Sequence, residues 1–597
     1  MLLQRAVIAH SIQMHRQLHP APFMLANTSK QRRVMHPSPP FQEIPYGRPN
    51  MDVVKTTAET LLERWDQTTS CAEQIALILE WDKNRGEFET NRTMAMVHFR
   101  QHTTDPACKA EQEHYDNVMP VILEQNVAFL ERVTSSPIRA ELEKELGSQV
   151  FALWDCFLGT FNPDIAEHKR REAKLRNEYA ELLAGLECEF QGKTYTLSEL
   201  QAFYGDPDRA TRLAAQQTKD RVMSAISEPL DRIYHDLVQV RHEMAQALGY
   251  ETFTPLGYRN MDRTDYNAED VAEYRKQVRE TVVPLAQKIY KRRSQAINIE
   301  EISFHDESVR DLKGVPCPKG DHDWMIERAT EMFDTLGDDF GYFFRMMTDC
   351  ELLDLKSRPG KSGGGFCADI PRYGVPFIFA NFNGTQDDVN VFTHECGHAF
   401  QNWSARHHTL LAYHWPTIEA AEIHSMSLEF LTYPHMEQFF GDDAARFREG
   451  HLEGAILFMP YGCAVDEFQH RVYENPTMTP TERAEVWKEL EAIYLPHRKY
   501  DGMEHNESGR LWQSQRHIYG MPFYYIDYCL AQTCALQMWN TANQDRDDTM
   551  ERYRKLCSLG GSLPFTKLLD EVGLVSPFDE NCLKDVCAAV QETLGLS

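Results

Sequence analysis

Residues 385–403 read TQDDVNVFTHECGHAFQNW, and after a short gap residues 416–429 read PTIEAAEIHSMSLE. In the first stretch His394 and His398 are separated by one helical turn, so on a helix both imidazoles lie on the same face. Glu395 follows the first of them directly. This H-E-x-x-H pattern is typical of a helix in which two histidines bind a metal ion and the carboxylate takes a proton from water.

The residues around the pattern favour a helix. Thr385 followed by Asp388 resembles a capping box, and it comes just after the turn-prone pair Asn383-Gly384. Apolar residues then recur at helical spacing, and the two histidines lie on nearly the opposite side. These apolar residues are Val389, Phe392, Cys396, Ala399, Phe400 and Trp403. We therefore predict a helix that packs its apolar side into a core, with Cys396 as a packing residue.

A catalytic metal site of this kind needs a third protein ligand and one position left open for water. Pro416 is placed to begin a second helix, and that helix carries Glu419, Glu422 and Glu429. All three lie on or near one face, and each also fits an ordinary solvated acidic face. Spacing alone does not choose among them.

Composition limits the function classes. The chain has 597 residues, of which 42% are hydrophobic and 25% charged, as in an ordinary globular protein. Its formal net charge of −28 argues against nucleic-acid binding, which needs a basic surface. Fourteen cysteines without a CxxC pair indicate reduced thiols and a cytoplasmic protein. No run of eighteen apolar residues occurs, so we expect no membrane-spanning helix.

Three regions follow one another along the chain. Residues 1–40 carry arginines and histidines and no acidic residue, and we expect a disordered extension there, with an organellar transit peptide as the alternative. Residues 41–205 are predicted to form an N-terminal helical region, and residues 206–597 the catalytic metallopeptidase region. Within these regions we predict helices over Thr56–Leu79, Val121–Val133, Ile138–Leu146 and Asp164–Leu186, a helix opening at Asp208, a break in the helices around Phe253–Tyr258, and strands over Phe366–Ile370 and Val375–Phe382.

A late aromatic segment, residues 512–539, contains His517 among several tyrosines. Aromatic runs are more often core than chemistry. Peptide hydrolysis, however, places negative charge on the carbonyl oxygen, and a tyrosine hydroxyl or an imidazole N–H near a metal site can stabilise that charge.

Together these residues resemble the oligoendopeptidase F and Pz-peptidase branch of the thimet oligopeptidase family of zinc peptidases. The resemblance covers the chain from about residue 41 to its end. It rests on Phe41–Pro49, Lys361–Phe382, Phe392–Trp403, Glu419–Phe430, Gln515–Leu530, Gly560–Ser562 and Ser576–Phe578.

The resemblance implies roles for individual residues. The zinc ligands would be His394, His398 and Glu422, since the family string E-x-x-S-x-x-L/M-E matches Glu422, Ser425 and Glu429. Glu429 would orient a ligand histidine. Oxyanion and substrate contacts would come from His517, Tyr525 and Tyr528, with Tyr519 and Tyr524 as competing candidates.

The resemblance also implies a fold and an activity. The fold would be mostly α, a helical ellipsoid with a deep central channel, zincin-type active-site helices and a small β-sheet beside them. The activity would be zinc-dependent endopeptidase cleavage of short peptides, with one Zn²⁺ per chain, Glu395 as general base, and no nucleic-acid or membrane partner. A dipeptidyl carboxypeptidase on a similar scaffold and a catalytically silent peptide-binding protein are the alternatives.

Overall fold

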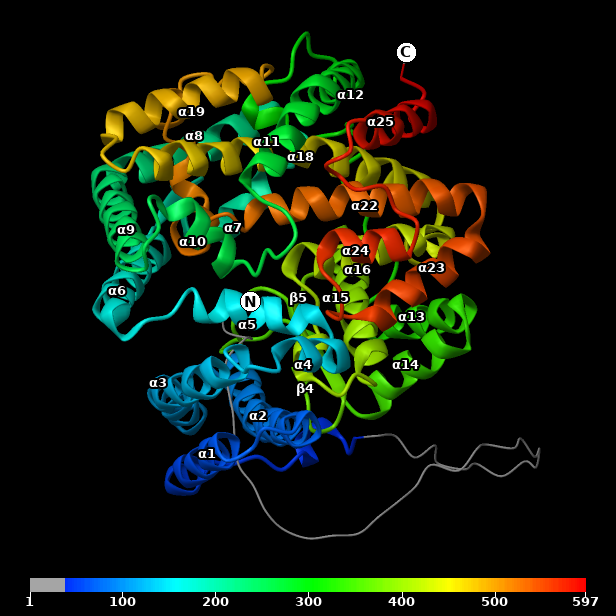
Figure 1. Ribbon diagram of the computed structural model, residues 1–597. Helices are drawn as coiled ribbons and strands as arrows, with labels where there is room; N and C mark the ends of the chain where they lie inside the picture. Colours follow the sequence, from blue (N-terminus) through cyan, green and yellow to red (C-terminus); the bar gives the residue numbers. More distant parts are fainter. Residues whose placement is uncertain (1–37, 597) are drawn as a thin grey trace, which may run out of the picture. The chain divides into compact units, whose positions relative to one another are not determined.

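Helices dominate the computed structural model, which describes residues 38–596 (Figure 1). The chain divides into two units, each assembled from three separate segments. Unit 1 takes in the chain up to Ser148, Ala329–Asn383 and Ala399–Trp415, and unit 2 takes in Gln149–Arg328, Gly384–His398 and Pro416 to the C-terminus. The expectation for residues 1–40 falls almost wholly outside the described residues, and the division at residue 205 stays a prediction.

Unit 1 combines helices with a small mixed sheet. Its elements are α1 (Met51–Asp66), α2 (Cys71–Gln101), α3 (Pro106–Thr134), α4 (Arg139–Leu146), α14 (Asp338–Asp349), β3 (Leu353–Lys356), β4 (Phe366–Ile370) and β5 (Val375–Phe382). Central strand β5 pairs antiparallel with β4, with Phe366 opposite Phe379, and parallel with β3. Strands β4 and β5 coincide with the two predicted strands, and β3 was not predicted.

Unit 2 is almost entirely helical. Its elements are α5 (Ser148–Leu158), α6 (Ala166–Ala184), β1 (Cys188–Phe190), β2 (Lys193–Tyr195), α7 (Leu197–Leu200), α8 (Arg209–Ala225), α9 (Ser227–Ala247), α10 (Phe253–Asn260), α11 (Ala268–Gln277), α12 (Val283–Ala296), α16 (Ile418–Leu431), α17 (Glu437–Phe440), α18 (Ala444–Glu474), α19 (Pro480–Tyr494), α20 (Glu504–Glu507), α21 (Arg516–Gly520), α22 (Tyr525–Gln544), α23 (Arg546–Leu559), α24 (Phe565–Glu571) and α25 (Cys582–Thr593). Helices α13 (His322–Leu336) and α15 (Gln386–Ala405) have residues in both units, and so does α5, whose first residue belongs to unit 1.

Two helix predictions were wrong in detail. The helix predicted over Thr56–Leu79 is two helices, because the chain leaves α1 at Gln67 and begins α2 after Ser70. The break predicted around Phe253–Tyr258 is instead helix α10, whose apolar side is buried, and the irregular segments flank it on both sides. At α10 the burial of apolar side chains stabilises the helix, and local propensity does not report that burial.

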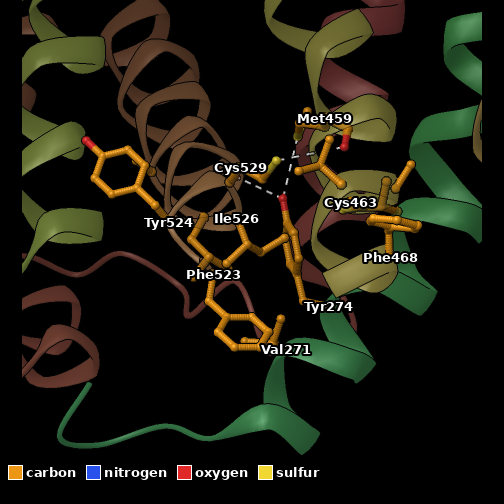
Figure 2. Packing of buried hydrophobic residues seen from close by; sticks show 14 of the residues in the cluster. Val271, Tyr274, Met459, Cys463, Phe468, Phe523, Tyr524, Ile526 and Cys529 are labelled. Carbon is orange, nitrogen blue, oxygen red and sulfur yellow. Dashed lines mark hydrogen bonds between the residues drawn. The ribbon is translucent and has the colours of Figure 1, made fainter. Parts of the chain in front are cut away.

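The core of unit 2 forms where α16 and α18 pack against α22 (Figure 1). Figure 2 shows part of it: the Tyr274 ring reaches between α18 and α22, and its hydroxyl donates to the Cys529 carbonyl at 2.9 Å. Tyr524 points the other way, with its hydroxyl turned away from this cluster. The start of α22 thus packs into this cluster, while Tyr524, the residue before the helix, points to its other side.

Across residues 38–596, no helix is both long enough and apolar enough to cross a lipid bilayer. The longest helices, α2 and α18, each carry several charged residues.

Candidate metal centre

Helix α15 presents His394, Glu395 and His398. Its first turn is held by two hydrogen bonds, from the Gly384 N–H to the Asp388 carboxylate at 2.7 Å and from the Asp388 N–H to the Thr385 carbonyl at 3.1 Å. The predicted helix is thus present and begins where its capping residues indicated. Five of its six predicted apolar residues are buried, with Cys396 fully so, and Trp403 is half-buried.

Helix α16 brings a carboxylate to the two imidazoles. An oxygen of Glu422 lies 3.2 Å from Nε2 of His394 and 3.5 Å from Nε2 of His398. The three candidate ligand atoms all lie within 4.8 Å of one another. No other group of three or more such residues meets this criterion in the described part of the chain. The residues that the family resemblance singled out are the ones that converge.

Two glutamates of α16, Glu419 and Glu422, differ in their surroundings and therefore in their protonation. Glu419 is buried outside this group, and burial beside Asp527 raises its pKa. Burial alone would also raise the pKa of Glu422, but His398 and His394 outweigh it and hold that pKa well below the usual range. Glu422 is therefore ionised and suited to bind a cation, whereas Glu419 favours the neutral form.

Gly397 allows α15 and α16 to approach closely. A Cβ atom at this position would lie 2.5 Å from the His424 carbonyl oxygen and 2.6 Å from Cα of Ser425, both on the backbone of α16. Backbone atoms cannot move aside as a flexible side chain can. The absence of a side chain at Gly397 thus keeps Glu422 within reach of the histidines.

Replacing Gly397 by alanine is expected to destabilise the protein by roughly 1–3 kcal/mol, as overpacking usually does, and to weaken metal binding because α16 must shift. Thermal unfolding and a metal titration would measure both effects. Gly454→Ala is the control, because a Cβ there meets nothing within 4 Å and the position is inside helix α18. The control should be neutral or stabilising. Equal behaviour of the two variants would contradict the close-packing explanation.

A chain of polar contacts begins at Nδ1 of His394, the ring nitrogen that does not face Glu422. Its Nδ1 donates to a Glu429 oxygen at 2.7 Å, and the second Glu429 oxygen accepts from Nε2 of His451 at 2.6 Å. The Tyr433 hydroxyl lies 2.8 Å from Nδ1 of His451. With Nδ1 of His394 protonated, its Nε2 is left to bind a metal, an arrangement common around metal-ligating histidines. His451 was not predicted, because nothing in one sequence ties a histidine of α18 to α15.

Glu395 is almost completely buried beside the two imidazoles. Its Oε2 atom accepts no hydrogen bond from the described residues. Burial raises the pKa of Glu395, while the neighbouring His398 and His394 lower it. A buried carboxylate with a raised pKa and an uncommitted oxygen is well suited to take up a proton and give it back.

The predicted late aromatic residues gather around His517. Its ring stacks on Tyr524 at 5.4 Å between centroids and lies 5.0 Å from Tyr525 and 6.1 Å from Tyr528. Tyr519, in contrast, is buried in the core, where its hydroxyl donates to the Leu230 carbonyl.

The tyrosines near His517 differ in what they face. The Tyr524 hydroxyl donates to a Glu422 oxygen at 3.1 Å, so Tyr524 contacts the candidate metal group itself. The Tyr528 hydroxyl is close enough to Glu422 and Glu395 for their charges to raise its pKa further, beyond the effect of burial. Tyr525 packs against Phe458 and Tyr461 instead. These contacts favour Tyr524 and Tyr528 over Tyr525 as hydrogen-bond donors beside the metal group.

The protonation states suit hydrogen-bond donation. Burial lowers the pKa of His517 to about 4, despite the opposing charge of Glu422. Burial, followed by the charge of Glu422, raises the pKa of Tyr524 well above its usual value. At neutral pH the imidazole is therefore uncharged and the phenol keeps its proton.

The residues present fit a divalent metal. Two imidazole nitrogens and one carboxylate oxygen are the donor set that catalytic zinc sites use, and Glu429 supplies the outer carboxylate that orients such a histidine. The ionised carboxylates of Glu422 and Glu429 also give the group the negative charge that attracts a cation.

Comparison with known proteins agrees with this geometry. Residues 41–161 match the model of the peptidase M3 N-terminal domain, and residues 326–586 match that of peptidase family M3. The second match contains all of the candidate metal ligands.

Solved structures and curated relatives point the same way. A structure of Pz peptidase A with an inhibitor is 42% identical and aligns with a TM-score of 0.87 over 93% of this chain and 99% of that one. A structure described as an oligoendopeptidase F is 43% identical, with a TM-score of 0.88 over 94% and 99% of the two chains. An oligoendopeptidase F homolog of Borreliella burgdorferi is 21% identical over 47% of this chain and 48% of its own length, so this chain matches about half of that relative.

Proposed function

Because this chain belongs to peptidase family M3 and is a metallopeptidase, we propose that it is a zinc-dependent oligoendopeptidase that cleaves internal bonds of short peptides. The observation that supports this most is the convergence of His394, His398 and Glu422, with the base Glu395 beside them.

Zinc would be held by His394, His398 and Glu422, and when bound it would supply Lewis acidity toward the scissile carbonyl and toward water. Glu395 takes a proton from the attacking water on its uncommitted oxygen and then gives it to the nitrogen of the departing amine. The hydroxyl of Tyr528 and an N–H of His517 donate hydrogen bonds to the carbonyl oxygen as it gains negative charge, while the single hydroxyl proton of Tyr524 stays hydrogen-bonded to Glu422.

The position of the cut distinguishes the proposed activity from its main enzymatic alternative. We expect the protein to cleave an internally quenched peptide that is blocked at both ends, because an endopeptidase needs no free terminus, whereas a dipeptidyl carboxypeptidase must find a free C-terminus. Mass spectrometry of the products, with and without a chelator, reads out both the site and the metal dependence. Cleavage only of peptides with a free C-terminus would contradict the proposal, and no metal-dependent cleavage at all would favour a silent peptide-binding protein.

Replacing His451 by phenylalanine is expected to weaken zinc binding about tenfold, the lower end of what loss of an outer partner costs. Glu429 would lose one of its two imidazole donors and hold His394 less firmly. Competition with a fluorescent chelator measures the zinc affinity.

His497→Phe is the matched control, because His497 also pairs with a half-buried glutamate, Glu307 at 2.9 Å, but outside the candidate metal group. The control should keep wild-type zinc affinity. Equal losses in both variants would mean that the effect is general destabilisation and not support of His394.

A further inference from the structure

A side-chain amide is held against the ring of His517. Nε2 of Gln515 lies 2.7 Å from Nδ1 of His517. The backbone of Gln515 is fixed on both sides, since its N–H donates to the Trp512 carbonyl and its carbonyl accepts from the Ile518 N–H. The amide therefore reaches the ring from a constrained loop that leads into α21.

The other end of this amide is anchored by helix α18. The Tyr461 hydroxyl donates to Oε1 of Gln515 at 3.1 Å. An amide whose oxygen accepts from Tyr461 offers its NH₂ group to the imidazole. Nδ1 of His517 is then an acceptor.

The tautomer of the ring follows from this contact. Burial lowers the pKa of His517 to about 4, so the neutral ring carries one proton. If Nδ1 accepts a hydrogen bond, that proton is on Nε2. Among the described residues, none accepts a hydrogen bond from Nε2, and the ring stacks on Tyr524, whose hydroxyl contacts Glu422. The Nε2–H group is thus free to donate to a ligand beside the metal group.

We propose that Gln515, anchored by Tyr461, is a positioning residue that keeps His517 in the Nε2–H tautomer, so that this N–H donates to the carbonyl oxygen of a bound peptide. The inference rests on the proposed peptidase function and adds two residues to it. The charged and titratable groups near the ring are Glu422 from α16, Arg516 from α21, Tyr461 from α18, Tyr525 and Tyr528 from α22, and Tyr524 just before α22.

The direct test is the ¹⁵N spectrum of histidine-labelled holoenzyme, with the signals of His517 assigned by their loss in His517→Gln. In the wild type we expect a proton on Nε2 and none on Nδ1. In Gln515→Glu the new carboxylate accepts from Nδ1, so the proton moves there or the ring becomes doubly protonated. In Gln515→Met both tautomers should be populated. A wild-type proton on Nδ1, or a tautomer unchanged by both substitutions, would overturn the proposal.

Kinetic measurements give a second test, because a purely structural role of Gln515 would not produce the pattern expected here. At pH 8, Gln515→Glu is expected to lose about 100-fold in kcat, the order that loss of one oxyanion donor costs, with KM and zinc content close to wild type. Activity should return partly at lower pH, because the carboxylate raises the pKa of His517 and the doubly protonated ring again carries an Nε2 proton. Gln515→Met should lose activity without this recovery.

The two proposals fail in different ways. If the wild-type protein binds zinc but cleaves no peptide, the proposed function is contradicted, yet the ¹⁵N spectrum still reports the tautomer of His517. If the wild-type protein cleaves peptides and the proton of His517 is on Nδ1, only the role proposed for Gln515 is contradicted. If Gln515→Glu does not fold, the ¹⁵N spectra of the wild type and of Gln515→Met still test the tautomer of His517.

Discussion

Replacing Glu395 by glutamine is expected to abolish turnover while leaving zinc bound. Glutamine keeps the size of the side chain and removes its basicity. Since Glu395 is not among the three converging ligands, zinc content should remain one per chain. Loss of a general acid–base group costs about 10²–10⁴-fold, and Glu395 would serve in two proton transfers, so we expect kcat to fall toward the upper end of that range.

The measurement pairs metal analysis with hydrolysis of a quenched peptide. Glu485→Gln is the matched control, because Glu485 is an exposed glutamate that pairs only with Lys488 among the described residues. It should behave as wild type. If Glu395→Gln cleaves the peptide within about tenfold of the wild-type rate, the loss is smaller than even the weakest usual effect of removing an acid–base group. That result would exclude Glu395 from the proton transfers.

The second large effect is expected from Glu422. Glu422→Gln replaces an ionised carboxylate, buried against two imidazoles, by a neutral amide. Zinc affinity should fall by much more than the roughly 10–100-fold that is lost when a hydrogen-bond partner of a metal ligand is removed. Activity should therefore vanish at ordinary zinc concentrations. Isothermal titration with zinc, or retention of zinc after dialysis, measures the change.

Glu419→Gln is an unusually close control for this experiment. Glu419 lies on the same helix, is equally buried, and was an equal candidate by spacing alone. Because burial raises its pKa toward the neutral form and it lies outside the converging group, its substitution should leave zinc affinity unchanged. Zinc loss in Glu419→Gln with retention in Glu422→Gln would reverse the ligand assignment.

Local sequence was sufficient for the helix that carries the two histidines and for two strands of the small sheet. The capping residues and apolar stripe of α15 are short-range features, and so are the strands β4 and β5, whose predicted and observed bounds agree. The helical class of the fold was likewise predicted correctly, since it follows from many such local patterns added together.

Long-range contacts account for what local sequence could not supply. Spacing on α16 left three glutamates open, and the family resemblance was needed to select Glu422. The contacts that join His394 to Glu429 and His451, and the contact of Tyr461 with Gln515, connect elements that are far apart in the chain. Helix α10 was mistaken for a break because its stability comes from burial in the surrounding helices, which no local window records.

The most direct test of the whole account is a crystal structure of the zinc-loaded protein with data collected at the zinc absorption edge. We predict one strong anomalous peak per chain, at about 2.0–2.2 Å from Nε2 of His394, Nε2 of His398 and an oxygen of Glu422. A peak bound elsewhere, or no peak in crystals of protein that still cleaves peptides, would contradict it.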